Sequence, residues 1–396
     1  MFVRFHGVRG STPICDLRTW RYGGNTACVE IETPGGQRIL VDAGTGLRPL
    51  GRSAGWAAPP RPLHAFWLLS HYHWDHIQGL PFFPPLYEAR HRFEFFGPRP
   101  EGGERMEAAL QGQMLRPYFP VDLSMLSAAR AFTEVAPGLR WRVGDATVEA
   151  AGLHHPQGCL GFRIETATGT LAYATDTEPG DPAGDAAVRH LARGADVLVY
   201  DAQYAPERLA SRRGWGHSTW EEGVRVAREA GARCLLLFHH DPDADDGVVD
   251  RHVQRARQAW PETWAAAEGL QVACRTPGVY VERVVSRIGP RITGRQPIRV
   301  RGKSVSGAPL ELKGFMANVT LKGTYLVVPE WDSLQPEVEI DLLDGEGNGK
   351  MMRGHVVRID VDPETGHPAI GVVFTAEETR PAPAGPRVRP RLPPVR

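Results

Sequence analysis

The stretch "SHYHWDHIQG", residues 70–79, contains three histidines and one aspartate within six consecutive positions. His71, His73, Asp75 and His76 form the pattern H-x-H-x-D-H. Imidazole and carboxylate groups are common ligands of divalent metal ions. The apolar run "HAFWLLSH" (64–71) leads directly into this cluster and is typical of a buried strand. The sequence therefore predicts a metal-binding loop at the end of a strand.

The composition of the chain excludes several classes of protein. The 396 residues include 46 Lys+Arg and 46 Asp+Glu, so no net positive charge favours duplex nucleic acid, and we expect none to bind. The five cysteines form no C-x-x-C pair, which argues against a disulfide framework or a zinc ribbon. We find no signal peptide and no apolar run of about 18 residues, so we expect a cytoplasmic protein without a membrane span.

Several other short apolar runs end in histidine or aspartate. They are "RILVDAG" (38–44), "TLAYATD" (170–176), "DVLVYDAQ" (196–203) and "RCLLLFHH" (233–240). In layered α/β folds, polar residues at strand ends often line the functional site. Between the last two runs, "STWEEGVRVAREAGA" predicts a helix with Ser218 or Thr219 as N-cap and Gly231 just after its end. These alternating elements predict an α/β fold over the first 285 residues.

A dinuclear metal site would need more ligands than the first cluster offers. Two subsites about 3.5–4 Å apart are a common hydrolytic device, and they usually share a bridging carboxylate. Candidates at the ends of later segments are His154 or His155, Asp176, and His239 or His240. Ligands so far apart in sequence have meaning only if the fold brings them together.

The order of these candidates points to a family. H-x-H-x-D-H, then a lone histidine, an aspartate and a histidine near a strand end resembles the metallo-β-lactamase fold, in its ribonuclease Z and cyclic phosphodiesterase branch. Further matches are "GNT" (24–26), "VDAGTG" (41–46) and "HPQGCLGFRIE" (155–165). The resemblance covers roughly residues 1–285 and implies an αββα sandwich.

The resemblance also implies the ligand set. One metal would be held by His71, His73 and His155, the other by Asp75, His76 and His239, with Asp176 between them. His155 is preferred to His154 because its interval to Gly161 matches the family, and His239 is preferred to His240. The second histidine of each pair would support a ligand instead. We expect two divalent ions, Zn²⁺ first, with Mn²⁺ or Fe²⁺ left open.

A further pair, Asp201 and His217, matches the positions where the resembled branch has an acid that orients a histidine. That histidine would protonate the leaving group. Here an aspartate stands where ribonuclease Z typically has glutamate, so the shorter side chain must still reach the imidazole. Asp75, Asp201 and His217 are the predicted catalytic residues.

Aromatic residues surround the first cluster. Trp74, Phe82, Phe83 and Tyr87 lie within or just after it. They fit stacking on a nucleobase, lining of a pocket or packing in the core, and the sequence does not choose among these roles.

The amino-acid composition of the chain changes after about residue 285. A basic segment rich in Gly and Pro precedes short β-rich runs, which predict a small β-barrel over residues 290–378. Arg295 and Arg299, followed by Asn318, Thr320 and Gly323, resemble the PilZ pattern R-x-x-x-R … [D/N]-x-S-x-x-G, with Thr320 in place of the usual Ser. The resemblance implies binding of cyclic di-GMP; the alternative is a β module that binds no nucleotide. The Pro/Arg-rich residues 379–396 predict a disordered tail.

The sequence thus predicts a dinuclear metal-dependent hydrolase, a phosphodiesterase acting on a small substrate of the cyclic nucleotide type. Its C-terminal domain is expected to bind cyclic di-GMP. One alternative is a cyclic di-GMP effector or scaffold that signals to a protein partner. Another is a hydrolase of a different ester or a lactone, since the same metal site serves both. A homodimer is left open.

Overall fold

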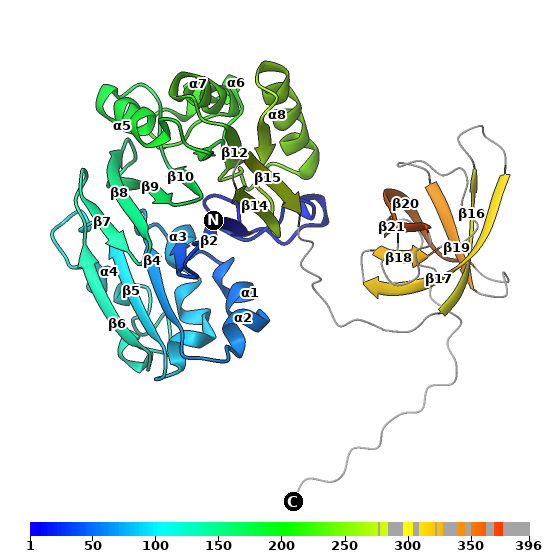
Figure 1. Cartoon of the computed structure of the whole chain (residues 1–396), viewed down its shortest axis with the longest axis horizontal. Helices are drawn as coiled ribbons and strands as arrows, with labels where there is room; N and C mark the ends of the chain where they lie inside the picture. Colours follow the sequence, from blue (N-terminus) through cyan, green and yellow to red (C-terminus); the bar gives the residue numbers. More distant parts are fainter. Residues whose placement is uncertain are drawn as a thin grey trace, which may run out of the picture. The chain divides into compact units, whose positions relative to one another are not determined.

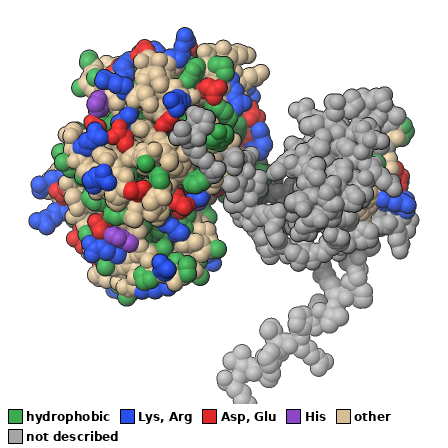
Figure 2. Space-filling view, viewed as in Figure 1, with side chains coloured by type: hydrophobic (Ala, Val, Ile, Leu, Met, Phe, Trp, Pro, Cys, Tyr) green, Lys and Arg blue, Asp and Glu red, His purple; other side chains and the backbone are tan. Residues whose placement is uncertain are grey.

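The computed structural model describes residues 1–275, 278–283, 296–303, 309–320, 323–327, 339–344, 350–361 and 368–374. The chain divides into two units, Met1–Ser286 and Arg287–Arg396 (Figure 1). Among the described helices, none is both long and apolar enough to cross a membrane. On the face shown in Figure 2, Lys and Arg side chains of the first unit are interspersed with Asp and Glu side chains.

The first unit is built on two mixed β-sheets. The first sheet has eight strands in the order β15 (Gly278–Arg283), β14 (Leu270–Arg275), β1 (Phe2–Gly7), β2 (Cys28–Glu32), β3 (Arg38–Val41), β4 (His64–Leu68), β5 (Arg92–Gly97) and β6 (Ala129–Glu134). The second has seven strands in the order β13 (Thr263–Ala265), β12 (Cys234–Phe238), β11 (Val197–Asp201), β10 (Gly169–Ala174), β9 (Cys159–Thr166), β8 (Ala146–Leu153) and β7 (Arg140–Val143).

Alternation along the strands places one set of apolar side chains between the two sheets. In β4, Phe66 and Leu68 join the central core, while Ala65 and Trp67 face the opposite side. In β12, Leu236 and Phe238 enter the same central core, whereas Leu235 and Leu237 face outward. Successive side chains of a strand point to opposite faces, so strands buried on both faces read as continuous apolar runs.

Helices cover both outer faces and complete four layers (Figure 1). The second sheet packs against α5 (Pro182–Ala192), α7 (Trp220–Ala230) and α8 (Asp246–Ala259). The first sheet carries α1 (Leu47–Gly51), α2 (Ala54–Ala57) and α4 (Met106–Gly112). The remaining α-helices are the short α3 (Trp74–Ile77) and α6 (Pro206–Leu209). This αββα arrangement confirms the predicted α/β sandwich.

Helix α7 begins and ends at the residues its sequence indicates. Of the two candidate N-caps, Thr219 is the one used: its side chain accepts a hydrogen bond from Glu222 N at 3.2 Å. Gly231 has a φ of 66°, the left-handed conformation that closes many helices. The helix therefore fixes the segment that precedes it, and that segment contains His217.

Parallel pairing brings several strand ends to the same edge. Strands β3 and β4 are parallel in the first sheet, and β10, β11 and β12 are parallel in the second. The carboxyl ends of parallel strands meet at one edge of a sheet, where crossover loops can hold functional side chains. This topology gathers the histidines and aspartates that the sequence places after separate apolar runs.

The second unit contains a closed barrel of six strands. Their order is β16 (Gln296–Lys303), β17 (Pro309–Thr320), β18 (Gly323–Val327), β21 (Pro368–Phe374), β20 (Lys350–Val361) and β19 (Glu339–Asp344). Arg299 lies on β16, and the backbones of Asn318 and Thr320 lie near the end of β17, where Thr320 pairs with Gly323. Arg295 and residues 379–396 fall outside the described residues. The assignment of this barrel to the PilZ class stays a prediction.

We expect Trp67→Ala to lower the free energy of unfolding of the first unit by about 3–5 kcal/mol. Trp67 is fully buried, stacks on Phe95 at 4.9 Å and donates a hydrogen bond to Asp42 O. Trp74→Ala is the matched control, because that ring is 75% exposed and its loss should cost less than about 0.5 kcal/mol. Urea unfolding followed by circular dichroism measures both. Equal losses for the two variants would contradict the packing described.

Candidate metal centre

The first cluster lies on the loop and short helix that follow β4. Helix α3 begins after His73, and its first turn directs Asp75 and His76 inward, where they are 6% and 0% exposed. His71 is also buried, at 2% exposure. Trp74 points away from this interior. The loop thus presents imidazole and carboxylate groups to one internal space.

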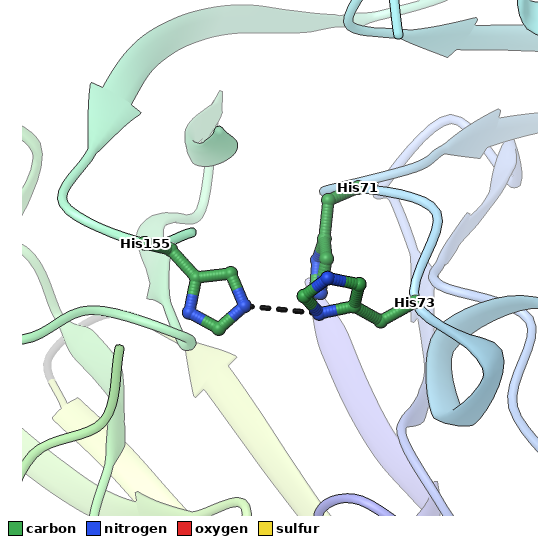
Figure 3. Close-up of side chains that lie close together, drawn as sticks. All are labelled: His71, His73 and His155. Carbon is green, nitrogen blue, oxygen red and sulfur yellow. Dashed lines mark hydrogen bonds between the residues drawn. The ribbon is translucent and has the colours of Figure 1, made fainter. Parts of the chain in front are cut away.

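Three later segments bring further side chains to the same space. His155 follows β8, Asp176 follows β10 and His239 follows β12. His155 Nε2 lies 3.1 Å from His73 Nδ1. Figure 3 marks this contact with a dashed line. His76 Nε2 lies 3.1 Å from His239 Nε2. Residues from both sheets therefore meet at one centre.

The side chains form two groups of three. The potential ligand atoms of His71, His73 and His155 all lie within 4.8 Å of one another, and the same holds for Asp75, His76 and His239. Asp176 lies between the two groups. One of its oxygens is 3.3 Å from His76 Nε2, and the other is 3.4 Å from His239 Nε2 and 3.9 Å from His155 Nε2. The structure thus brings all seven predicted ligands together; their roles as ligands stay predictions.

The donor set fits divalent cations. His71 Nε2 is buried and has no hydrogen-bond partner among the described residues. Burial holds the pKa of His71 well below its usual range, so its nitrogen keeps a lone pair for a metal. Asp75, Asp176 and Asp201 are also buried, and every ion pair described for them is with a histidine. Buried carboxylates without Lys or Arg partners favour bound cations.

Each histidine is also held through its other ring nitrogen. The contacts are His71 Nδ1 to Ser70 Oγ (3.0 Å), His73 Nε2 to Gln157 Oε1 (2.9 Å), His76 Nδ1 to Asp42 Oδ2 (2.8 Å), His155 Nδ1 to Gly216 O (2.9 Å) and His239 Nδ1 to Gln203 Oε1 (2.8 Å). Such partners fix the orientation and tautomer of metal-binding imidazoles.

None of these five supporting partners was predicted from the sequence. Asp42 directly follows strand β3, so its place at the end of an apolar run was a usable signal. Gln157 lies in the stretch 155–165 and Gln203 ends the run 196–203, but only the fold places these two side chains beside their histidines.

The backbone around the centre is strained. All the described non-glycine residues with positive φ touch this site: Ser11 (61°), Asp42 (59°), Gln157 (64°), Asp176 (58°) and His239 (59°). Ser11 N donates a hydrogen bond to Asp75 Oδ2 at 2.7 Å, which explains its place in the group. Such conformations cost about 1–3 kcal/mol each and cluster at functional sites. The surrounding fold therefore holds the centre in a geometry that the local chain disfavours.

The structure also separates the two pairs of adjacent histidines. His154 is exposed and its Nδ1 lies 3.0 Å from Glu178 O, while His155 faces the centre. His240 is buried and its Nε2 lies 2.9 Å from Ala266 O, while His239 faces the centre. The members preferred from the sequence are the ones that the fold turns inward.

Asp201 and His217 form a close pair beside the centre. His217 Nδ1 lies 2.9 Å from Asp201 Oδ2, so the shorter side chain of aspartate reaches the imidazole. Asp201 also accepts hydrogen bonds from the backbone N–H groups of Asp176, Gln203 and Ser218. Burial lowers the pKa of His217, but the carboxylates of Asp201, Asp176 and Asp75 together outweigh burial and raise that pKa to about 9. Cations bound nearby would lower it again, because like charges repel.

A buried glutamate holds the loop that leads to His217. Glu178 Oε2 accepts hydrogen bonds from Gly214 N at 2.8 Å and Gly216 N at 3.0 Å. Gly216 has a φ of 82°, and a Cβ there would lie 2.1 Å from His155 Nδ1. Only glycine fits this close approach, so the loop and His155 are fixed together.

A cavity of about 310 Å³ lies beside two of the inward-facing histidines. Its walls include His71, Tyr72, His73, Pro98, Arg99, Gln157 and Gly158. It leaves room for a group of a bound substrate next to the centre.

The fold and the centre define a metal-dependent hydrolase. Residues 37–240 match the family described as the Beta-lactamase superfamily domain, and the chain belongs to this superfamily. The chain is 29% identical over 288 residues to Ribonuclease Z of Salinibacter ruber, covering 59% of this chain and 84% of the relative. It is 28% identical over 272 residues to Ribonuclease Z of Methanopyrus kandleri, covering 61% and 88%.

A solved structure supports the fold. The metallo-β-lactamase fold protein YhfI from Bacillus subtilis superposes with a TM-score of 0.52 at 20% identity, covering 71% of this chain and 98% of that chain. The relatives also correct one expectation. They carry the name of a ribonuclease, which conflicts with the exclusion of duplex nucleic acid drawn from the net charge. Net charge reports the average over the surface and says nothing of the local field at one site.

We expect His155→Ala to lower the bound metal per chain, because the variant removes one of three imidazoles of a subsite. His154→Ala is a matched control, since its exposed ring faces away from the centre. Both proteins should be loaded with Zn²⁺, desalted and analysed by inductively coupled plasma mass spectrometry. Equal metal content in the two variants would show that His155 is no ligand.

Proposed function

We propose that the first unit is a dinuclear phosphodiesterase. The observation that carries this proposal is the position of Asp176 between two groups of three potential ligands. When bound there, two divalent ions, Zn²⁺ by preference, supply an activated water and offset charge on the phosphate oxygens. The proposed ligands are His71, His73 and His155 for one ion, Asp75, His76 and His239 for the other, and Asp176 for both.

His217 is proposed as the proton donor to the leaving oxygen. Asp201 engages its Nδ1, which leaves Nε2 as the nitrogen that can donate. The Asp201 carboxylate favours the protonated imidazole, so the ring can hold the proton that the leaving oxygen requires. Asp75 is proposed as a catalytic group as well as a ligand, because a carboxylate at that point can accept the proton that the attacking water loses.

The substrate is proposed to be small, of the cyclic nucleotide type. The cavity of about 310 Å³ beside His71 and His73 suits a compact phosphodiester. The ribonuclease relatives make RNA a second substrate to test. Hydrolysis of a different ester or a lactone is the remaining enzymatic alternative, since the same centre serves that chemistry.

The test compares two phosphodiesters that differ in leaving group. Metal-loaded protein should hydrolyse bis(p-nitrophenyl) phosphate and adenosine 2′,3′-cyclic monophosphate, and His73→Ala should lose both activities. His217→Ala should lower kcat for the cyclic nucleotide by about 10²–10⁴-fold and affect the p-nitrophenyl ester far less, because an alkoxide needs the proton and p-nitrophenolate does not. Spectrophotometry and chromatography follow the two reactions.

The outcomes separate the parts of this proposal. Hydrolysis of neither compound by folded, metal-loaded protein would replace the phosphodiesterase proposal with the ester or lactone alternative. Equal losses on both substrates in His217→Ala would remove His217 as the proton donor. His154→Ala serves as the control variant for both reactions.

For the second unit we propose cyclic di-GMP binding on the barrel. Arg299 on β16 is partly buried, and its Nε has no hydrogen-bond partner among the described residues. Its Nη1 lies 3.1 Å from Glu311, which also pairs with Arg301 at 3.0 Å. A guanidinium can bind a phosphate with two donors and stack on guanine. Arg295, Asn318, Thr320 and Gly323 complete the proposed site, and an effector that signals to a protein partner is the alternative use of this ligand.

Isothermal titration calorimetry of the full chain with cyclic di-GMP tests this second proposal. We expect saturable binding that weakens at least tenfold in Arg299→Ala, because one ionic phosphate contact is lost. Arg255→Ala is the control, since that side chain is 55% exposed in a surface ion pair with Glu207. Absence of binding would favour the β module without a nucleotide ligand.

A further inference from the structure

One wall of the cavity beside the metal centre is formed by the turn that follows β8. Gln157 and Gly158 of this turn line the cavity together with His71 and His73. Gly158 N donates a hydrogen bond to His155 O at 3.0 Å, and this bond closes the turn. A side chain of the turn can therefore touch a group that is bound next to these histidines.

Glutamine at position 157 adopts a backbone conformation that suits glycine better. Its φ is 64°, and its side chain is exposed. A left-handed φ is disfavoured for a residue with a Cβ atom, because Cβ approaches the following carbonyl oxygen. Residues that are held in such conformations cluster at functional sites. We therefore expect the side chain at this position to have a function that glycine could not serve.

The carboxamide of Gln157 has one end engaged and one end free. Its Oε1 lies 2.9 Å from His73 Nε2. His73 Nδ1 faces His155 Nε2 at 3.1 Å, so Nδ1 is the nitrogen placed to hold a metal, and Nε2 carries the proton. The carboxamide must therefore present its oxygen to His73. Among the described residues Gln157 Nε2 has no hydrogen-bond partner, so its two N–H groups are available.

Another wall of the cavity comes from the segment that follows β5. The Tyr72 hydroxyl donates a hydrogen bond to Pro98 O at 2.5 Å, which holds this segment against the first cluster. Arg99 and Glu101 of the segment both line the cavity. Their opposite charges offset one another, so this wall adds no net attraction for an anion. The carboxamide of Gln157, by contrast, has only donors left to offer.

We infer that Gln157 contacts both the metal site and the substrate. Its carbonyl oxygen holds His73, and its amide nitrogen donates a hydrogen bond to a phosphoryl oxygen of the substrate in the cavity. Hydrogen bonds to a charged acceptor are stronger than those between neutral groups, so one amide can contribute measurably to affinity. This inference rests on the proposed phosphodiesterase and names a residue that recognises its reacting group.

The contact with His73 is tested with two variants of Gln157 in the full chain. Gln157→Glu keeps an oxygen for His73 but has no donor for the substrate, whereas Gln157→Gly removes both contacts and suits the positive φ. Gln157→Gly should lose about 10- to 100-fold in affinity for Zn²⁺, and Gln157→Glu should stay within about threefold of the unchanged protein. Competition with a chromophoric chelator measures these affinities.

The contact with the substrate is tested by calorimetric titration with methyl phosphate at saturating Zn²⁺. Both variants should bind it about 10- to 100-fold more weakly than the unchanged protein, because a hydrogen bond to a charged acceptor is lost. A loss in Gln157→Gly cannot result from the added charge of glutamate. Gln258→Glu, which alters an exposed glutamine on α8 outside the cavity, should leave both affinities unchanged.

The outcomes separate this inference from the proposed function. If the unchanged protein binds methyl phosphate but does not hydrolyse bis(p-nitrophenyl) phosphate, the phosphodiesterase proposal fails, and the affinities still decide on Gln157. Undiminished binding of methyl phosphate by Gln157→Gly would overturn the contact with the substrate, as would absence of binding by the unchanged protein. Equal losses of Zn²⁺ affinity in the two variants would overturn the contact with His73.

Discussion

Burial of negative charge is the constraint on which the first unit depends. Asp42, Asp75, Asp176 and Asp201 lie at one centre with exposures between 0% and 6%. An ionised carboxylate without compensation is costly in a protein interior. Histidines that surround these carboxylates supply hydrogen bonds and, when protonated, charge. Bound divalent ions would supply further positive charge. Hydrolysis at this centre and stability of the fold therefore both require cations beside these carboxylates.

Rigidity follows from how the centre is supported. Each inward-facing imidazole is held at its second nitrogen, and several neighbours keep a left-handed backbone that costs energy. Asp201 connects these loops. Its carboxylate accepts from His217, from the backbone N–H of Gln203 in its own loop, and from the backbone N–H groups of Asp176 and Ser218 in two other loops. A displacement of one of these loops therefore disturbs the hydrogen bonds that hold the others.

Much of the grouping of these side chains could be predicted from the sequence, because the proposed ligands follow apolar runs. The short length and continuous apolar character of those runs indicate buried strands, and parallel strands bring their ends together. From the sequence, His155 was preferred to His154 only because its interval to Gly161 matches the resembled family. In the structure the His155 ring faces the centre and the His154 ring does not. Supporting residues such as Gln203 and Glu178 could not be predicted, since a hydrogen bond between distant loops leaves no periodic signal. The net charge carries no spatial information, so it could not decide whether one surface of the chain attracts a nucleic acid.

The proposed ligands of each group come from both sheets. His71 and His73 follow β4 of the first sheet, whereas His155 follows β8 of the second; Asp75 and His76 likewise face His239 of the second sheet. An ion bound to either group is thus a cross-link between the layers. Each tenfold rise in free metal above the dissociation constant adds about 1.4 kcal/mol per site to the folded state. The lifetime of the folded chain then depends on the metal supply of its surroundings as well as on its apolar core.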